Sequence, residues 1–210
     1  VMRDYLIMLG ATALFIGLAF GGSFGWLQGL ILLGALAVAL TELFIRTRRQ
    51  KLADTDLEGA DPGLPGWRVA LLLGVGLVGL PLGADLLVDG SISVARALGV
   101  SEAVIGLTIV AVGTSLPELA TTMAAAIRRE GGVALGNVLG SNLFNLLAII
   151  GVASLVGPIP VPPEMLSKDL WVMAGASVLL AAWVFTGRSI GRLGGVGFLA
   201  LYALYLVSLF

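Results

Sequence analysis

Two apolar stretches, residues 102–128 and 132–156, carry polar side chains near their midpoints. The first contains the run GTSLPE at residues 113–118. A carboxylate near the centre of a bilayer costs about 2.5–3.5 kcal/mol on insertion scales, which makes Glu118 a functional candidate. Pro117 lacks an N–H, and its ring clashes with the carbonyl four residues earlier. The run therefore predicts a helix that is broken in mid-membrane and carries a charge beside the break.

Oxygen atoms of other kinds accompany this carboxylate. Thr114 lies four residues before Glu118 and Ser115 lies three before it, so both share its side of a helix. The break also frees backbone carbonyls, including that of Ala111. The chain has no His and no Cys. Any metal ligands are therefore oxygens, which favours hard cations such as Ca²⁺. The alternative is a kinked helix in which Glu118 makes a structural hydrogen bond.

The second stretch places Asn137, Ser141 and Asn145 at intervals of four residues, so they form one polar stripe on a helix. Their hydroxyl and amide oxygens are weak neutral ligands for a cation. Hydrogen bonding between helices is the alternative role of such a stripe. The neighbouring Glu118 favours the ligand role. Asn142 points away from the stripe, and we expect it to be structural.

The elements that hold these residues are membrane-spanning helices. The chain of 210 residues is 58% hydrophobic and 12% charged, whereas soluble domains contain roughly 25% charged residues. Alternation at the strand period is absent, which argues against an outer-membrane barrel. No basic run points to nucleic acid as a partner. We expect an all-α membrane protein with seven transmembrane helices, two of them broken at mid-membrane. The expected spans are about 4–22, 26–45, 68–91, 102–128, 132–156, 169–187 and 193–210.

The basic residues predict the orientation of these spans. Residues 46–65 form the long polar segment and read as a cytoplasmic linker. With that linker inside, seven alternating spans place ten of the twelve Lys and Arg residues on the cytoplasmic side and only Arg96 and Lys168 outside. We therefore expect a cytoplasmic N-terminus and an extracytoplasmic C-terminus.

An internal repeat predicts the architecture. Residues 3–45 align without a gap on residues 168–210, with ten of 43 positions identical. Five spans separate the two copies, so the copies face opposite ways in the membrane, as in secondary transporters. Residues 1–45 are then the last two spans of a first repeat, and 66–210 are a complete second repeat of five spans. We expect roughly 100 further residues, three spans, to precede Val1 in a complete transporter of this kind.

The residues also resemble a known family. The run GLTIVAVGTSLPELATTMAAAIRREGGVALGNVLGSNLFNLL, residues 106–147, closely resembles the second alpha-repeat of the sodium/calcium exchanger family, among the cation/calcium antiporters. The preceding GADLLVDGSISVARALGVSEAVIG matches too. The resemblance implies a ten-span antiporter fold of two inverted five-span repeats (5+5). The cation ligands that it implies here are Ala111, Thr114, Ser115, Glu118, Ser141 and Asn145.

Some members of the family carry Asp where this chain has Asn145, so the identity of the coupling ion stays open. Calcium takes 6–8 oxygen ligands, usually with carboxylates among them, and the implied set supplies only one negative charge. We therefore expect half of a site, to be completed by a first-repeat segment or a partner chain.

The expected function is secondary active antiport, most simply Ca²⁺ exchanged for Na⁺ or H⁺ by alternating access. The alternative is a truncated, inactive or accessory membrane fragment that needs an upstream partner segment. No enzyme activity and no cofactor are expected, since the ions are cargo. The expected partners are the transported cations and the lipid bilayer, and the expected location is a prokaryotic inner membrane.

Overall fold

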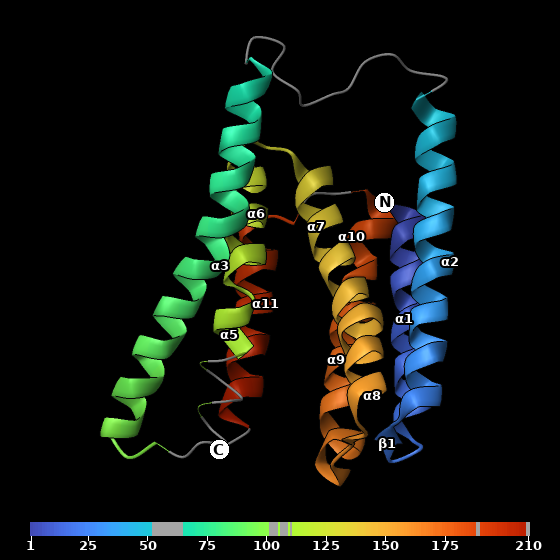
Figure 1. Ribbon diagram of the computed structural model, residues 1–210, viewed down its shortest axis with the longest axis vertical. Coiled ribbons are helices and arrows are strands. Elements are labelled where there is room, and N and C mark those ends of the chain that lie inside the picture. Colours follow the sequence, from blue (N-terminus) through green and yellow to red (C-terminus); the bar gives the residue numbers. More distant parts are fainter. Residues whose placement is uncertain (52–64, 101–104, 106–108, 110, 188–189, 209–210) are drawn as a thin grey trace. The chain divides into compact units, whose positions relative to one another are not determined.

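The computed structural model describes residues 1–51, 65–100, 105, 109, 111–187 and 190–208. The chain divides into two compact units (Figure 1). Unit 1 comprises Val1–Leu57 and Glu130–Ser189, and unit 2 comprises Glu58–Arg129 and Ile190–Phe210.

Helices dominate both units. In unit 1 the elements are α1 (Met2–Ala19), β1 (Ser23–Phe24), α2 (Trp26–Lys51), α7 (Gly131–Leu143), the π-helix η2 (Phe144–Ile149), α8 (Ile150–Val156), β2 (Ile159–Pro160), the π-helix η3 (Met165–Asp169), α9 (Leu170–Leu179) and α10 (Ala181–Thr186). In unit 2 they are α3 (Gly66–Ala97), α5 (Ala111–Thr114), α6 (Leu116–Ile127) and α11 (Arg192–Val207).

Within the described residues, five helical segments are long and apolar enough to cross a membrane. Two shorter apolar helices, Leu116–Ile127 and Arg192–Val207, fall in the other two expected spans. Large apolar side chains are widely exposed, as on α3, where Leu77 is 80% exposed. Such a surface is suited to the hydrocarbon of a bilayer rather than to water. The long segments are Met2–Ala19, Trp26–Arg48, Gly66–Ala97, Gly131–Val156 and Met165–Thr186.

Helix α1 is central to the packing of unit 1. Phe15 belongs to a buried cluster that also takes in residues of α2, η2 and α9, and its ring stacks on Phe24 with centroids 4.7 Å apart. At the other end, Tyr5 is fully buried; its hydroxyl donates a hydrogen bond of 2.9 Å to the carbonyl of Ser177. The Tyr5 ring also meets Phe185 edge to face at 5.8 Å. Helix α1 thus joins the start of unit 1 to the α9–α10 segment.

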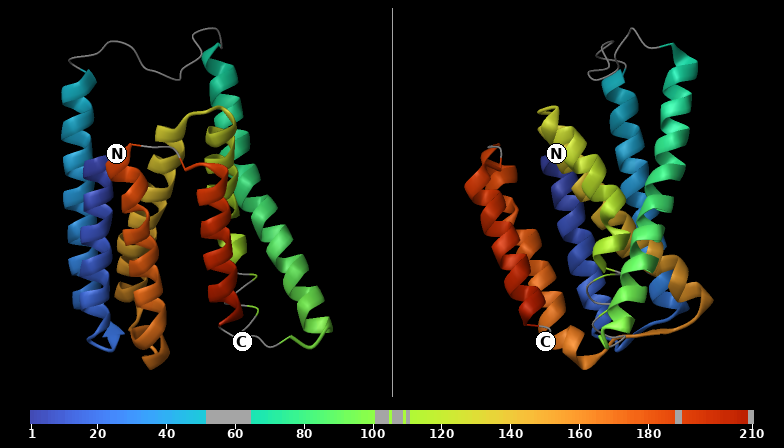
Figure 2. Two further views of the ribbon diagram at one scale, coloured as in Figure 1. Left: turned by 180° about the vertical axis from the view of Figure 1, so that it is seen from behind. Right: turned by 90° about the vertical axis from the view of Figure 1, so that its left-hand side faces the viewer.

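A short antiparallel pairing connects two loops of unit 1. Strand β1 pairs with β2, with Ser23 opposite Pro160 and Phe24 opposite Ile159. The N–H of Val161 also donates to the carbonyl of Gly22 at 2.9 Å. The loop after α1 and the loop after α8 therefore lie at the same end of unit 1, as the two views in Figure 2 show.

At the opposite end of α1, an ion-pair group links that helix to α2. Arg46 donates through Nη1 to Asp4 at 3.0 Å and through Nη2 to Glu42 at 2.7 Å. The spacing of Glu42 and Arg46 predicts the second pair, because residues four apart on a helix are neighbours. The pair with Asp4 depends on the tertiary fold. Figure 1 shows α1 and α2 running side by side as a hairpin.

Two glycines allow α2 and α8 to approach closely. A Cβ atom built on Gly29 would lie 2.7 Å from the carbonyl oxygen of Gly151, and one on Gly151 would lie 2.9 Å from Cγ of Leu33. Both distances are below ordinary van der Waals contact. Small residues at such crossings are a common means of packing helices in membranes.

We predict that Gly29→Ala lowers the melting temperature of the detergent-solubilised protein, because the added methyl forces α2 and α8 apart at a cost of about 1–3 kcal/mol. Gly34→Ala, on the same helix, is the matched control. A Cβ at Gly34 would meet no atom of the described residues within 4 Å. Equal melting temperatures for the two variants would contradict the close crossing.

Candidate functional site

The first polar segment is interrupted as predicted. Helix α5 ends at Thr114, Ser115 adopts a turn conformation with φ −93° and ψ 1°, and α6 begins at Leu116 with Pro117 in its first turn. The N–H of Ser115 donates to the carbonyl of Val112 at 3.1 Å. A continuing α-helix would direct that N–H to Ala111 instead.

The interruption changes the hydrogen bonding of two carbonyls. The tight turn diverts the Ser115 N–H from the carbonyl of Ala111. Pro117 has no N–H to offer the carbonyl of Gly113. Both carbonyls lie within one turn of Thr114 and Ser115, so the break gathers backbone and hydroxyl oxygens in a short length of chain.

Glu118 lies in the first turn of α6. Its side chain is half-buried, and its Oε2 atom has almost no accessible surface. The N-terminal end of a helix carries partial positive charge, which favours a carboxylate there. Thr114 and Ser115 are exposed. One turn later, the Thr121 hydroxyl donates to the carbonyls of its own helix, Pro117 at 3.1 Å and Glu118 at 3.0 Å.

The second polar segment differs from the expected break. Residues Gly131–Val156 form one continuous helical segment, α7–η2–α8. Its irregularity is the π-helix η2, in which the N–H of Ile150 reaches the carbonyl of Asn145, five residues back. This segment contains no proline, so every residue retains the N–H that a continuous helix requires. π-helical turns within α-helices are frequent at functional sites.

Ser141 and Asn145 lie on either side of the start of η2. Ser141 is half-buried, and its hydroxyl donates to the carbonyl of Val138 at 3.1 Å. That donation leaves the oxygen lone pairs to act as acceptors or ligands. Asn145 is exposed in the first turn of η2. Asn142 donates through Nδ2 to the same Val138 carbonyl at 2.9 Å, as suits the structural role expected of it.

The six predicted ligands divide between the two units. Four of them, Ala111, Thr114, Ser115 and Glu118, lie together across the break in unit 2, and Ser141 and Asn145 lie together in unit 1. No group of three or more His, Cys, Asp or Glu side chains within the described part of the chain could hold a metal ion. Glu118 is the one carboxylate in the predicted set, so neutral oxygens make up the rest.

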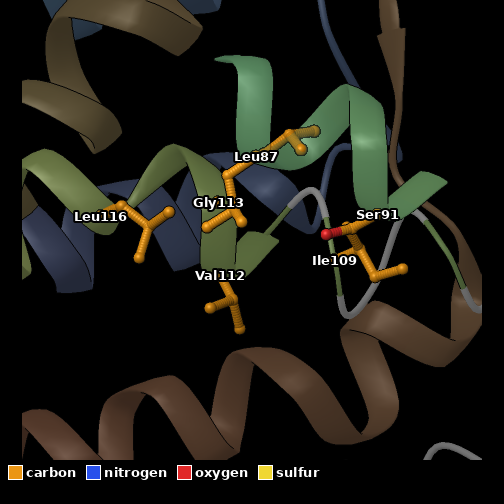
Figure 3. Close-up of a pocket in the computed structure, with 7 residues that line it drawn as sticks. Leu87, Ser91, Ile109, Val112, Gly113 and Leu116 are labelled. Carbon is orange, nitrogen blue, oxygen red and sulfur yellow. The ribbon is translucent and has the colours of Figure 1, made fainter. Parts of the chain in front are cut away.

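A feature that the sequence did not reveal lies beside the break. A mainly apolar pocket of about 310 Å³ is lined by residues of α3, α5 and the start of α6 (Figure 3). Gly113 is the sequence signal for the neighbouring helix, because a glycine at a buried break permits the close approach of another helix, here α3. The pocket is lined by Leu87, Val88, Ser91, Ile109, Val112, Gly113 and Leu116.

Fold and motif together define an α-helical integral membrane protein with an oxygen-rich interruption in one span. Comparison with known proteins gives the family. The model of the sodium/calcium exchanger protein family matches residues 68–210. The chain therefore belongs to the sodium/calcium exchanger family.

Individual relatives agree. Sodium/calcium exchanger MaX1 of Methanosarcina acetivorans is 46% identical over 115 residues, which are 55% of this chain and 33% of that protein. The uncharacterized membrane protein MJ0091 of Methanocaldococcus jannaschii is 40% identical over 189 residues, which are 89% of this chain and 59% of that protein. A structure of the exchanger NCX_Mj matches with a TM-score of 0.77 and 33% identity, covering 98% of this chain and 65% of that one. This chain thus spans less than two thirds of each.

We predict that Ca²⁺ raises the melting temperature of the complete protein and that Ser141→Ala reduces this rise, because the stabilisation by a bound ligand increases with the logarithm of its concentration divided by Kd. A tenfold loss of affinity removes about 1.4 kcal/mol of that stabilisation. Asn142→Ala, which removes an amide bonded within its own helix, should leave the rise unchanged. Equal shifts in both variants would exclude Ser141 as a ligand.

Proposed function

We propose that the protein containing this chain is a secondary active cation antiporter that exchanges Ca²⁺ for Na⁺ or H⁺ by alternating access. The observation that carries the proposal is the placement of Glu118. Its half-buried carboxylate lies in the first turn of α6, directly after the interruption of an apolar segment. An acidic residue in such a position marks an ion pathway in membrane proteins.

The proposed site combines oxygens of both polar segments. Glu118 supplies the charge, Thr114 and Ser115 supply hydroxyls, and the Ala111 carbonyl is placed within one turn of them. Ser141 and Asn145 add a hydroxyl and an amide oxygen. Such a set approaches the 6–8 oxygens that Ca²⁺ takes at 2.3–2.6 Å.

Charge balance requires a further contribution. One carboxylate neutralises half of the charge of Ca²⁺, and Asn145 adds none. We infer that a first-repeat segment or a partner chain supplies a second carboxylate. The internal repeat supports this inference, as does the span of the chain, which covers 33% to 65% of the relatives described above. Transport is therefore proposed for the complete protein rather than for these residues alone.

The same charge balance explains why exchange would be obligatory. Two carboxylates without a cation are costly to enclose in a low-dielectric membrane interior. The occluded state then forms readily only when Ca²⁺ or the coupling ions neutralise them. The change between the inward-open and outward-open states would therefore require bound cations in each direction.

We further propose seven spans within an inverted 5+5 arrangement, with the N-terminus in the cytoplasm. The distribution of Lys and Arg supports this orientation. The pairing of β1 with β2 supports the number of spans, since two loops on one side require an even number of crossings between them. Four expected spans lie between those loops. A prokaryotic inner membrane is the proposed location, and the 36% identity to the inner membrane protein YrbG of Escherichia coli supports it.

We predict that Glu118→Gln reduces Na⁺-driven Ca²⁺ uptake by the complete protein at least about tenfold, which corresponds to about 1.4 kcal/mol. The substitution keeps the size of the side chain and removes its charge. Uptake is measured as radioactive calcium entering liposomes that carry an outward Na⁺ gradient. A second arm replaces this gradient with a pH gradient and so identifies the coupling ion.

The matched control is Glu42→Gln, which removes an exposed carboxylate paired with Arg46 at 2.7 Å. We expect its uptake to remain within about twofold of the unmodified protein, since surface ion pairs contribute only about 0–1 kcal/mol. Normal exchange by the Glu118→Gln protein would refute the proposed role of Glu118. Absence of calcium uptake by the unmodified protein under either gradient would refute the proposed function.

A further inference from the structure

One close contact in unit 2 lies directly beside the interruption. Gly113, the third residue of α5, is buried against Val88 of α3. A Cβ atom built on Gly113 would overlap Cγ2 of Val88 and would also lie 3.4 Å from its Cβ and 3.9 Å from its Cγ1. Among the described residues these three atoms are the nearest ones, and all belong to Val88. One side chain thus excludes every residue larger than glycine at position 113.

The valine cannot readily turn away from this contact. Its β-branched side chain has one strongly preferred rotamer within a helix. Residue 88 lies well inside α3, which extends from Gly66 to Ala97. The contact therefore joins a stiff side chain on a long helix to the backbone of a short one. The position of the Val88 side chain is therefore set by α3 rather than by the break between α5 and α6.

The surroundings of the contact are open. Leu87 and Ser91 of α3 line a cavity of about 310 Å³, together with Val112 of α5 and Leu116 of α6. Figure 3 shows Gly113 between these two sets of side chains. Gly113 is thus closely packed against Val88, next to a cavity. We infer that the Val88 side chain is a main contact that holds α5 in place against α3.

The residue held in this way is the one on which the proposed site depends. Gly113 bears the carbonyl that lacks the Pro117 N–H, and it is followed directly by Thr114 and Ser115. A shift of α5 relative to α3 would move these oxygens with respect to Glu118.

We propose that Val88 is a positioning residue for cation binding. Its side chain, seated against Gly113, holds the break between α5 and α6 in the geometry that presents the oxygens of residues 113–118. This inference rests on the proposed function. It assigns no ligand role to Val88, which acts through the backbone of its partner.

The test is a double-mutant cycle in the complete protein reconstituted in liposomes. We expect Gly113→Ala to raise the calcium concentration for half-maximal uptake at least about tenfold, since misplacement of about 1 Å can cost 10²-fold at a reacting centre. We expect Val88→Ala to raise it by a smaller factor. In the double variant, the half-maximal calcium concentration should return to within about threefold of that of the unmodified protein. The methyl group introduced at position 113 then occupies space that the Val88 side chain filled.

Gly83→Ala on α3 is the matched control and should leave uptake unchanged, because a Cβ there would meet no atom of the described residues within 4 Å. The melting temperature of each variant shows whether it is folded. A half-saturating concentration that stays normal in Gly113→Ala would overturn the inference, and so would a folded double variant no better than Gly113→Ala. Failure of the unmodified protein to exchange calcium would instead refute the proposed function. The measurement on the unmodified protein therefore separates failure of the proposed function from failure of the inference about Val88.

Discussion

The hydrocarbon core of a bilayer cannot hydrogen-bond a peptide group, and every helix of this protein is subject to that constraint. A helix interrupted within a bilayer exposes carbonyls that must find partners in protein, in water or in a cation. Pro117 imposes such an interruption between α5 and α6, and Glu118 follows it at the positive end of the new helix. In the proposed function, a cation satisfies both the carbonyls and the carboxylate. Its binding then offsets the cost of breaking the helix in lipid, which couples the stability of this region to that proposed function.

The two units serve this arrangement differently. In unit 1, α1 packs through its buried Tyr5 and Phe15 against the continuous helical segment that carries Ser141 and Asn145. In unit 2, α3 supports a short interrupted helix through the contact of Val88 with Gly113. Two of the six proposed ligand residues thus lie on a continuous helix, widened at η2. The other four lie at a break whose geometry depends on a neighbouring helix.

The sequence predicts features that arise from local chemistry. The break at residues 113–118 follows from the missing N–H of Pro117, and the Glu42–Arg46 pair follows from a spacing of four residues. The prediction that the second segment is also broken was wrong. Residues 132–156 contain no proline, and their helical hydrogen bonds continue through a π-helix. Such a turn has no clear local signature. The β1–β2 pairing, the Asp4–Arg46 pair and the Val88–Gly113 contact join residues 25 to 137 positions apart, and composition and periodicity carry no information about them.

The proposed function requires one cation to bind oxygens of both polar segments. Anomalous diffraction from crystals of the complete protein grown with Sr²⁺ in place of Ca²⁺ can locate that cation. We expect an anomalous peak at coordination distance, about 2.3–2.6 Å for Ca²⁺, from the Glu118 carboxylate and from at least one side-chain oxygen of Ser141 or Asn145. A cation bound elsewhere, or one that contacts the first segment alone, would refute the proposed site.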